Sequence, residues 1–124
     1  MFDISRIFRL IYDEYSDISK TNPMDTEFIQ EKNFHFALHT LSFCHDLAQH
    51  REYTLSQKLL EQLQHIQTTV QEALAARRPS ERWMRRMKAV KLLRETTGYL
   101  SGTPSAAGLL DEGKAFMEIL NVEV

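Results

Sequence analysis

The sequence predicts an all-α protein, an antiparallel bundle of four to five helices in a single domain over residues 1–124. Three observations predict it. Apolar residues recur at three- and four-residue intervals over long stretches, and no segment keeps the two-residue alternation of a strand. The three prolines also fall where these helical patterns stop or start. With 43% apolar and 26% charged residues, the chain can fill one core and keep a polar surface.

The first predicted helix covers residues 3–19, and the turn T-N-P-M-D follows it. Asp3 or Ser5 can cap its start. Apolar residues recur along this segment at the spacing of an amphipathic helix. Its apolar residues are Ile4, Ile7, Phe8, Ile11, Tyr15 and Ile18.

Residues 24–78 are too many for one globular helix, so we expect two, over residues 26–50 and 55–77. The break falls at H-R-E-Y-T, where Thr54 and Gln57 have the spacing of a capping box. In the earlier helix the core candidates are Phe34, Leu38, Leu41, Cys44 and Ala48. In the later helix they are Leu59, Leu60, Leu63, Ile66, Val70, Ala73 and Leu74.

The next predicted helix covers residues 79–100, with Ser80 as its expected N-cap. The connection before it is short, so it should run antiparallel to its predecessor. Its core side is expected to carry Trp83, Met87, Val90 and Leu93. After a loop around S-G-T-P-S, a last amphipathic helix is expected over residues 105–121, with Leu109, Leu110, Phe116, Met117 and Leu120 on its apolar side.

Positive charge is concentrated in residues 77–94, which hold eight basic residues and one acid, Glu81. The whole chain has a net charge of -2, so the remaining residues are strongly acidic. The basic segment either pairs with acids of its own fold or faces an anionic partner. We therefore take its cations as candidate partner-binding or nucleic-acid-binding residues: Arg77, Arg78, Arg82, Arg85, Arg86, Lys88, Lys91 and Arg94. Among them, Arg85 and Arg86 would suit bidentate contacts to carboxylate or phosphate.

Histidines gather on the predicted helix over residues 26–50. His35, His39, Asp46 and His50 fall within about 60° of one another on a helical wheel. His35 and His39, four residues apart, are candidates for metal ligands, because their imidazoles could share one ion. A metal site in a bundle also needs ligands from a facing helix, and no second such motif is present. A solvent-exposed polar face is the favoured interpretation, and no metal or other cofactor is expected.

The run H-T-L-S-F-C-H-D-L-A, which begins at His39, resembles the accepting segment of histidine phosphotransfer domains. Those domains are four-helix bundles of about this length with a histidine in an H-x-L-K-G-like context. His39 and Leu41 match the pattern, whereas Ser42 stands in place of the lysine and Phe43 in place of the glycine. The resemblance implies a phosphoryl-accepting His39 as one alternative function.

Several function classes lack their signatures. The four glycines all lie from Gly98 onward, so no glycine-rich phosphate loop precedes them, and no catalytic constellation stands out. No apolar run is long enough for a membrane span, and the single Cys44 indicates a reducing, cytoplasmic location. We expect a non-enzymatic helical protein–protein interaction module, such as an adaptor, regulatory or assembly subunit. Its partner would be another protein or a second copy of the chain, with nucleic-acid binding through residues 77–94 as the alternative.

Overall fold

The structure, a computed structural model, describes residues 23–121, and the side chains of residues 26–121. Its elements are α2 (Pro23–Gln49), α3 (Tyr53–Ala75), α4 (Pro79–Leu100), the short 3₁₀ helix η1 (Pro104–Ala106) and α5 (Ala107–Leu120). No strand occurs within residues 23–121. The predicted all-α fold is confirmed, while the predicted helix over residues 3–19 lies outside the described residues.

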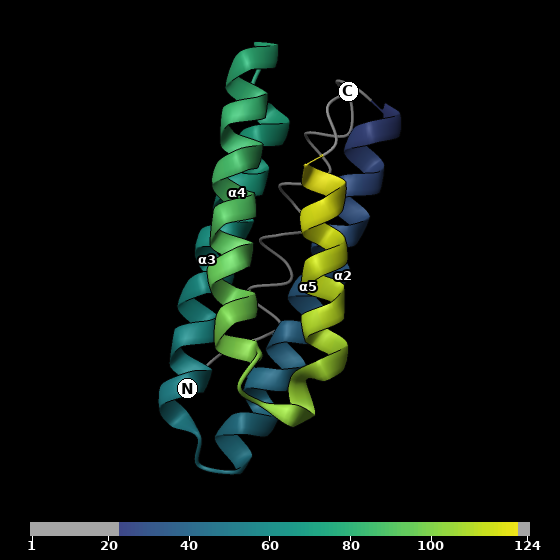
Figure 1. Cartoon of the computed structure of the whole chain (residues 1–124). Helices are drawn as coiled ribbons and strands as arrows, with labels where there is room; N and C mark the ends of the chain where they lie inside the picture. Colours follow the sequence, from purple (N-terminus) through teal and green to yellow (C-terminus); the bar gives the residue numbers. More distant parts are fainter. Residues whose placement is uncertain (1–22, 122–124) are drawn as a thin grey trace.

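The four long helices form an up-and-down bundle (Figure 1). Each consecutive pair packs together, and α5 closes the bundle by also packing against α2. Because α3 and α5 each separate α2 from α4, the latter two stand at opposite corners and run in the same direction (Figure 1). The predicted antiparallel pairing of α3 and α4 is confirmed, and no helix within residues 23–121 is long and apolar enough to span a membrane.

All four long helices contribute to one core. The rings of Phe36 on α2 and Phe116 on α5 lie 5.9 Å apart between centroids, and both side chains are buried. The apolar stripe predicted for α3 is confirmed, with its central side chains buried and Leu60 and Leu74 half-buried. The largest fully buried apolar side chains are Phe36, Leu41, Leu59, Ile66, Leu93, Leu100, Phe116 and Leu120.

The core face predicted for α2 is partly wrong. Leu41 and Cys44 are buried as expected, but Leu38 is 39% exposed, and Phe34 and Ala48 are half-buried. The reason is that polar residues occupy the buried face, so an apolar pattern alone selects a neighbouring face. The buried side chains of α2 are Thr26, Ile29, Gln30, Asn33, Phe36, Ala37, Thr40, Leu41, Cys44 and Leu47.

Hydrogen bonds between α2 and α3 make this polar burial possible. The amide of Asn33 donates to the side-chain oxygen of Gln67 at 3.2 Å, and Gln67 donates back at 2.6 Å. Further along, the Ser56 hydroxyl of α3 donates to the Cys44 carbonyl of α2 at 3.0 Å. Buried polar groups with partners cost little, whereas a shift of α2 along α3 would leave both amides unpaired. The pair therefore favours one register of α2 against α3.

The side-chain caps predicted at Thr54 and Ser80 are wrong. Helix α3 begins at Tyr53, one residue before Thr54, and its N-cap Glu52 makes no side-chain capping bond. The preceding Arg51 has φ 63°, a left-handed conformation that turns the chain sharply enough to start the helix early. Helix α4 begins at Pro79, because proline suits the first helical position, and this places Ser80 inside the helix.

The core side predicted for α4 is also rotated from the observed one. Val90 and Leu93 are buried and Met87 is half-buried, but Trp83, predicted to pack in the core, is 36% exposed. The buried face of α4 contains small and polar residues, because these let α3 and α5 approach closely. Its members are Ala89, Val90, Leu93, Thr96, Thr97 and Leu100.

Candidate functional site

Arg85, one of the eight cations of residues 77–94, joins α4 to α3. Its Nη2 donates to Oε1 of Glu81, one turn earlier on α4, at 3.1 Å, and its Nη1 donates to Oε2 of Glu72 on α3. Glu81, the one acid within residues 77–94, is thus paired with a cation of the same segment. Arg85 has carboxylate partners, as its residue type suggested, but they belong to the fold.

Arg86 holds the end of α5. Its Nε donates to the Leu120 carbonyl at 3.0 Å, and its Nη2 donates to the Ile119 carbonyl at 3.1 Å. The last carbonyls of a helix have no partner within the helix, and they carry the negative end of its dipole. A guanidinium at this position donates hydrogen bonds to these carbonyls and places a positive charge at the negative end of the dipole. Arg86 therefore has a structural role that the sequence did not indicate.

The other six cations form no ion pair with a carboxylate among residues 26–121. Five of them are exposed, and Arg82 is half-buried. Three lie at the start of α4 or just before it, and three lie along the helix. They are Arg77, Arg78 and Arg82 in the first group and Lys88, Lys91 and Arg94 in the second.

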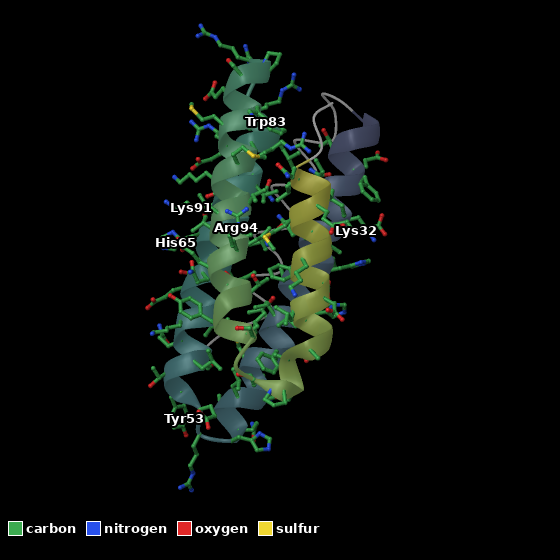
Figure 2. The ribbon with its side chains drawn as sticks, viewed as in Figure 1. Lys32, Tyr53, His65, Trp83, Lys91 and Arg94 are labelled. Atoms are coloured by element: carbon green, nitrogen blue, oxygen red, sulfur yellow. The ribbon has the colours of Figure 1, made fainter. Side chains whose placement is uncertain are left out.

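The three cations along α4 share a surface with two large apolar side chains, and we call these five residues the α4 outer face: Trp83, Met84, Lys88, Lys91 and Arg94. On a helical wheel they span about 140°. Trp83 is 36% exposed and Met84 is 68% exposed. Figure 2 shows Trp83 near the N-terminal end of α4, with Lys91 and Arg94 further along it.

One acid, Glu95, falls within the same sector of α4. Its Oε2 accepts a hydrogen bond from the Gln62 side chain of α3 at 3.3 Å. The surface is therefore predominantly positive, with exposed apolar groups at one end. Such a surface can attract an anionic partner over a distance and bury apolar groups on contact.

The three histidines of α2 and His50, which follows it, are exposed, as expected for a solvated face. His39 nevertheless has a partner that the sequence did not reveal, since its Nδ1 lies 2.6 Å from Oε2 of Glu112 on α5. The ring of His35 is 6.4 Å from that of His39 between centroids. Within residues 26–121, no three or more His, Cys, Asp or Glu side chains are grouped so that they could hold a metal ion.

The surroundings of His39 also bear on the phosphoryl alternative. The charged group against this imidazole is the Glu112 carboxylate, whose negative charge opposes a phosphoryl group. Phe43, in place of the glycine of the resembled family, is half-buried against the core. Neither feature supports phosphate at His39.

Cys44 is a core residue, as predicted. Its side chain is 3% exposed, and burial raises the pKa of the thiol to about 12. Because the thiolate is the reactive species, the thiol stays protonated and unreactive at neutral pH. It has no role as a nucleophile in the folded protein.

No protein-family model, curated protein or solved structure matches the chain. The function must therefore be argued from the chemistry of its surface. Within residues 26–121, the α4 outer face combines unpaired charge with exposed apolar groups, and the histidine face of α2 combines imidazoles with one acid partner. The α4 outer face is therefore the stronger candidate for a binding surface.

Proposed function

We propose that the protein is a non-enzymatic helical interaction module that binds an acidic, amphipathic helix of a protein partner through the α4 outer face. The observation that carries the proposal is the combination on one helix of exposed Trp83 and Met84 with three cations that have no acidic partner among residues 26–121. Since Cys44 is the single cysteine, a reducing compartment such as the cytoplasm suits the chain.

The two kinds of side chain would contribute in different ways. Covering the indole of Trp83 and the thioether of Met84 would supply most of the affinity, since apolar burial is favourable and tryptophan is enriched among dominant interface residues. Lys88, Lys91 and Arg94 would mainly accelerate association and select acidic partners. These exposed cations form no ion pair within residues 26–121, so pairing them at a contact breaks no ion pair of the fold and costs only part of their hydration.

Nucleic-acid binding is the competing function, because unpaired cations on α4 could also contact phosphates. Two features favour a protein partner. The Met84 thioether has no charge or hydrogen-bond donor for a phosphate backbone. In addition, the chain as a whole carries a net charge of -2 with a pI near 6.2. A polyanion would be repelled by much of the remaining surface.

The test uses a synthetic amphipathic peptide of glutamate and leucine and a mixed-sequence DNA duplex of similar length. Binding of each is measured by fluorescence anisotropy between about 50 and 200 mM salt. Reversing two cations, in Lys88→Glu/Lys91→Glu, should weaken peptide binding at least about 10-fold, because like charges then oppose each other at the contact. Truncating the indole, in Trp83→Ala, should weaken it by a similar factor.

The matched control is Arg51→Glu/Lys114→Glu, which makes the same change of charge between α2 and α3 and on α5, outside the α4 outer face. This variant should bind the peptide almost as the wild type does. Equal losses in both double variants would mean that only net charge matters, and the proposed surface would be wrong. Tighter binding of DNA than of peptide, with no effect of Trp83→Ala, would favour the nucleic-acid function.

A further inference from the structure

The outward side of α2, at the opposite corner of the bundle, has the opposite character to the α4 outer face. We call its first half the α2 outer face: Glu27, Phe28, Glu31, His35 and Leu38. These residues span about 100° of the helical wheel, directly away from the core. Phe28 is 48% exposed and Leu38 is 39% exposed. Both glutamates are exposed and form no ion pair within residues 26–121.

The α2 outer face is thus acidic and apolar, where the α4 outer face is basic and apolar. Lys32 is the one Lys or Arg residue of α2, and its Nζ lies 5.6 Å from the centroid of the Phe28 ring. Glu27 and Glu31 are one helical turn apart, as Lys88 and Lys91 nearly are. Each face therefore offers two charges about one turn apart beside large apolar groups, with the signs exchanged.

We infer that the partner helix bound by the α4 outer face is the α2 outer face of a second copy of the chain. The inference rests on the proposed function and adds the identity of the partner. It is carried by charge complementarity together with exposed apolar groups on both faces. The α2 outer face is itself the acidic, amphipathic helical surface that the α4 outer face is suited to bind.

The geometry of the bundle determines the kind of assembly. Helices α2 and α4 stand at opposite corners (Figure 1). The residues of each outer face lie across the helical wheel from the buried residues of the same helix, so the two faces point away from the core in different directions. A copy that uses its α4 to bind a neighbour keeps its own α2 outer face open. The contact is head-to-tail, and further copies can add at both ends. Association should therefore increase steadily with protein concentration and weaken with salt.

The experiment exchanges the charges of the two faces. One variant is Glu27→Lys/Glu31→Lys, and the other is Lys88→Glu/Lys91→Glu. Sedimentation velocity at low salt measures the average mass of each variant alone, of an equimolar mixture and of the wild type. Each variant alone should associate at least about 100-fold more weakly than the wild type, because it presents two faces of the same sign.

The mixture should recover association, since the basic α2 of the first variant then meets the acidic α4 of the second. A single chain that carries all four substitutions should also associate, because its two faces are again complementary. Recovery cannot arise from misfolded variants, so it separates a specific contact from a loss of fold. Circular dichroism and thermal unfolding of each variant provide the direct check on folding.

Two results would overturn the inference: a wild type that stays monomeric at the highest concentration at low salt, or a mixture that remains monomeric. The peptide assay then shows which proposal has failed. If Lys88→Glu/Lys91→Glu still loses the glutamate–leucine peptide while Glu27→Lys/Glu31→Lys keeps it, the interaction function stands and the partner is a different protein. If neither variant affects the peptide, the proposed function falls as well.

Discussion

On α2 and α4, the side chains that face inward and those that face outward differ in size as well as in polarity. On α4, the side chains that meet α3 and α5 include Ala89, Thr96 and Thr97, while the side that faces away carries Trp83 and Met84. The same contrast is found on α2, where the small polar Thr40 is buried and the larger apolar Leu38 is exposed. Small residues at these contacts let the helices pack closely around large buried side chains such as Phe36 and Leu93, while Trp83, Met84 and Leu38 are left for another surface. Stability should therefore depend on the inward sides and binding on the outward ones.

The inward side of α4 should be most sensitive at Leu93, which is completely buried. Leu93→Ala removes apolar contacts and leaves a cavity, and we expect the free energy of unfolding to fall by about 2–5 kcal/mol. Urea unfolding followed by circular dichroism measures the change. Leu92→Ala, at a half-buried position next to it, is the control and should cost clearly less. Equal costs at both sites would contradict the assignment of the inward side.

Cys44, on the inward side of α2, should make stability depend on alkaline pH. Burial raises the pKa of its thiol from 9.0 to about 12, so the folded state retains a proton that the unfolded state loses. The stabilisation is complete below pH 9 and disappears as the pH rises toward 12, with a full effect of up to about 4 kcal/mol. Urea unfolding from pH 8 to 10.5 should show this slope in the wild type. In Cys44→Ala the slope should be smaller, and identical slopes would show that the thiol does not titrate differently on folding.

Gly113 tests how tightly the inward sides of α4 and α5 approach each other. A Cβ atom at this position would lie 3.0 Å from Cγ2 of Thr97 and 3.4 Å from Cε1 of Phe36. We expect Gly113→Ala to lower the midpoint of thermal unfolding, with a loss of about 1–3 kcal/mol from overpacking. Gly108→Ala, where a Cβ atom meets nothing within 4 Å, is the matched control on the same helix. That change should be neutral or slightly stabilising, because alanine favours the helix.

Arg86 lies on the inward side of α4, half-buried, where its side chain reaches the end of α5. Arg86→Met keeps most of the apolar stem but removes the hydrogen bonds to the carbonyls of Ile119 and Leu120. We expect a loss of about 1–2 kcal/mol, with faster hydrogen exchange at the end of α5. Arg82→Met, one turn earlier at a cation with no acidic partner among residues 26–121, should change stability by less. If α5 exchanges equally in both variants, Arg86 does not hold its end.

The number of helices in residues 23–121 and their approximate bounds could be predicted from the sequence, because apolar periodicity and proline positions are local signals. The stripe on α3 was also predictable, since its apolar residues recur at helical spacing, but the polar residues buried beside them were not: Ser56, Gln67, Thr69 and Gln71. The buried face of α2 was not, because Asn33 is buried through a partner 34 residues away. The presence of a cationic segment was evident, but which of its cations the fold uses depends on contacts that only the packed bundle creates.

The outward cations should contribute least to stability, and this is the most direct test of the comparison. In Lys88→Gln/Lys91→Gln/Arg94→Gln, no ion pair within residues 26–121 is lost, and glutamine remains a good helix former. We expect the free energy of unfolding to change by less than about 0.5 kcal/mol per site, since exposed charges contribute little. The same variant should lose peptide binding and self-association. A large loss of stability would mean that these cations have partners within the fold, and binding would then have to be sought on another surface.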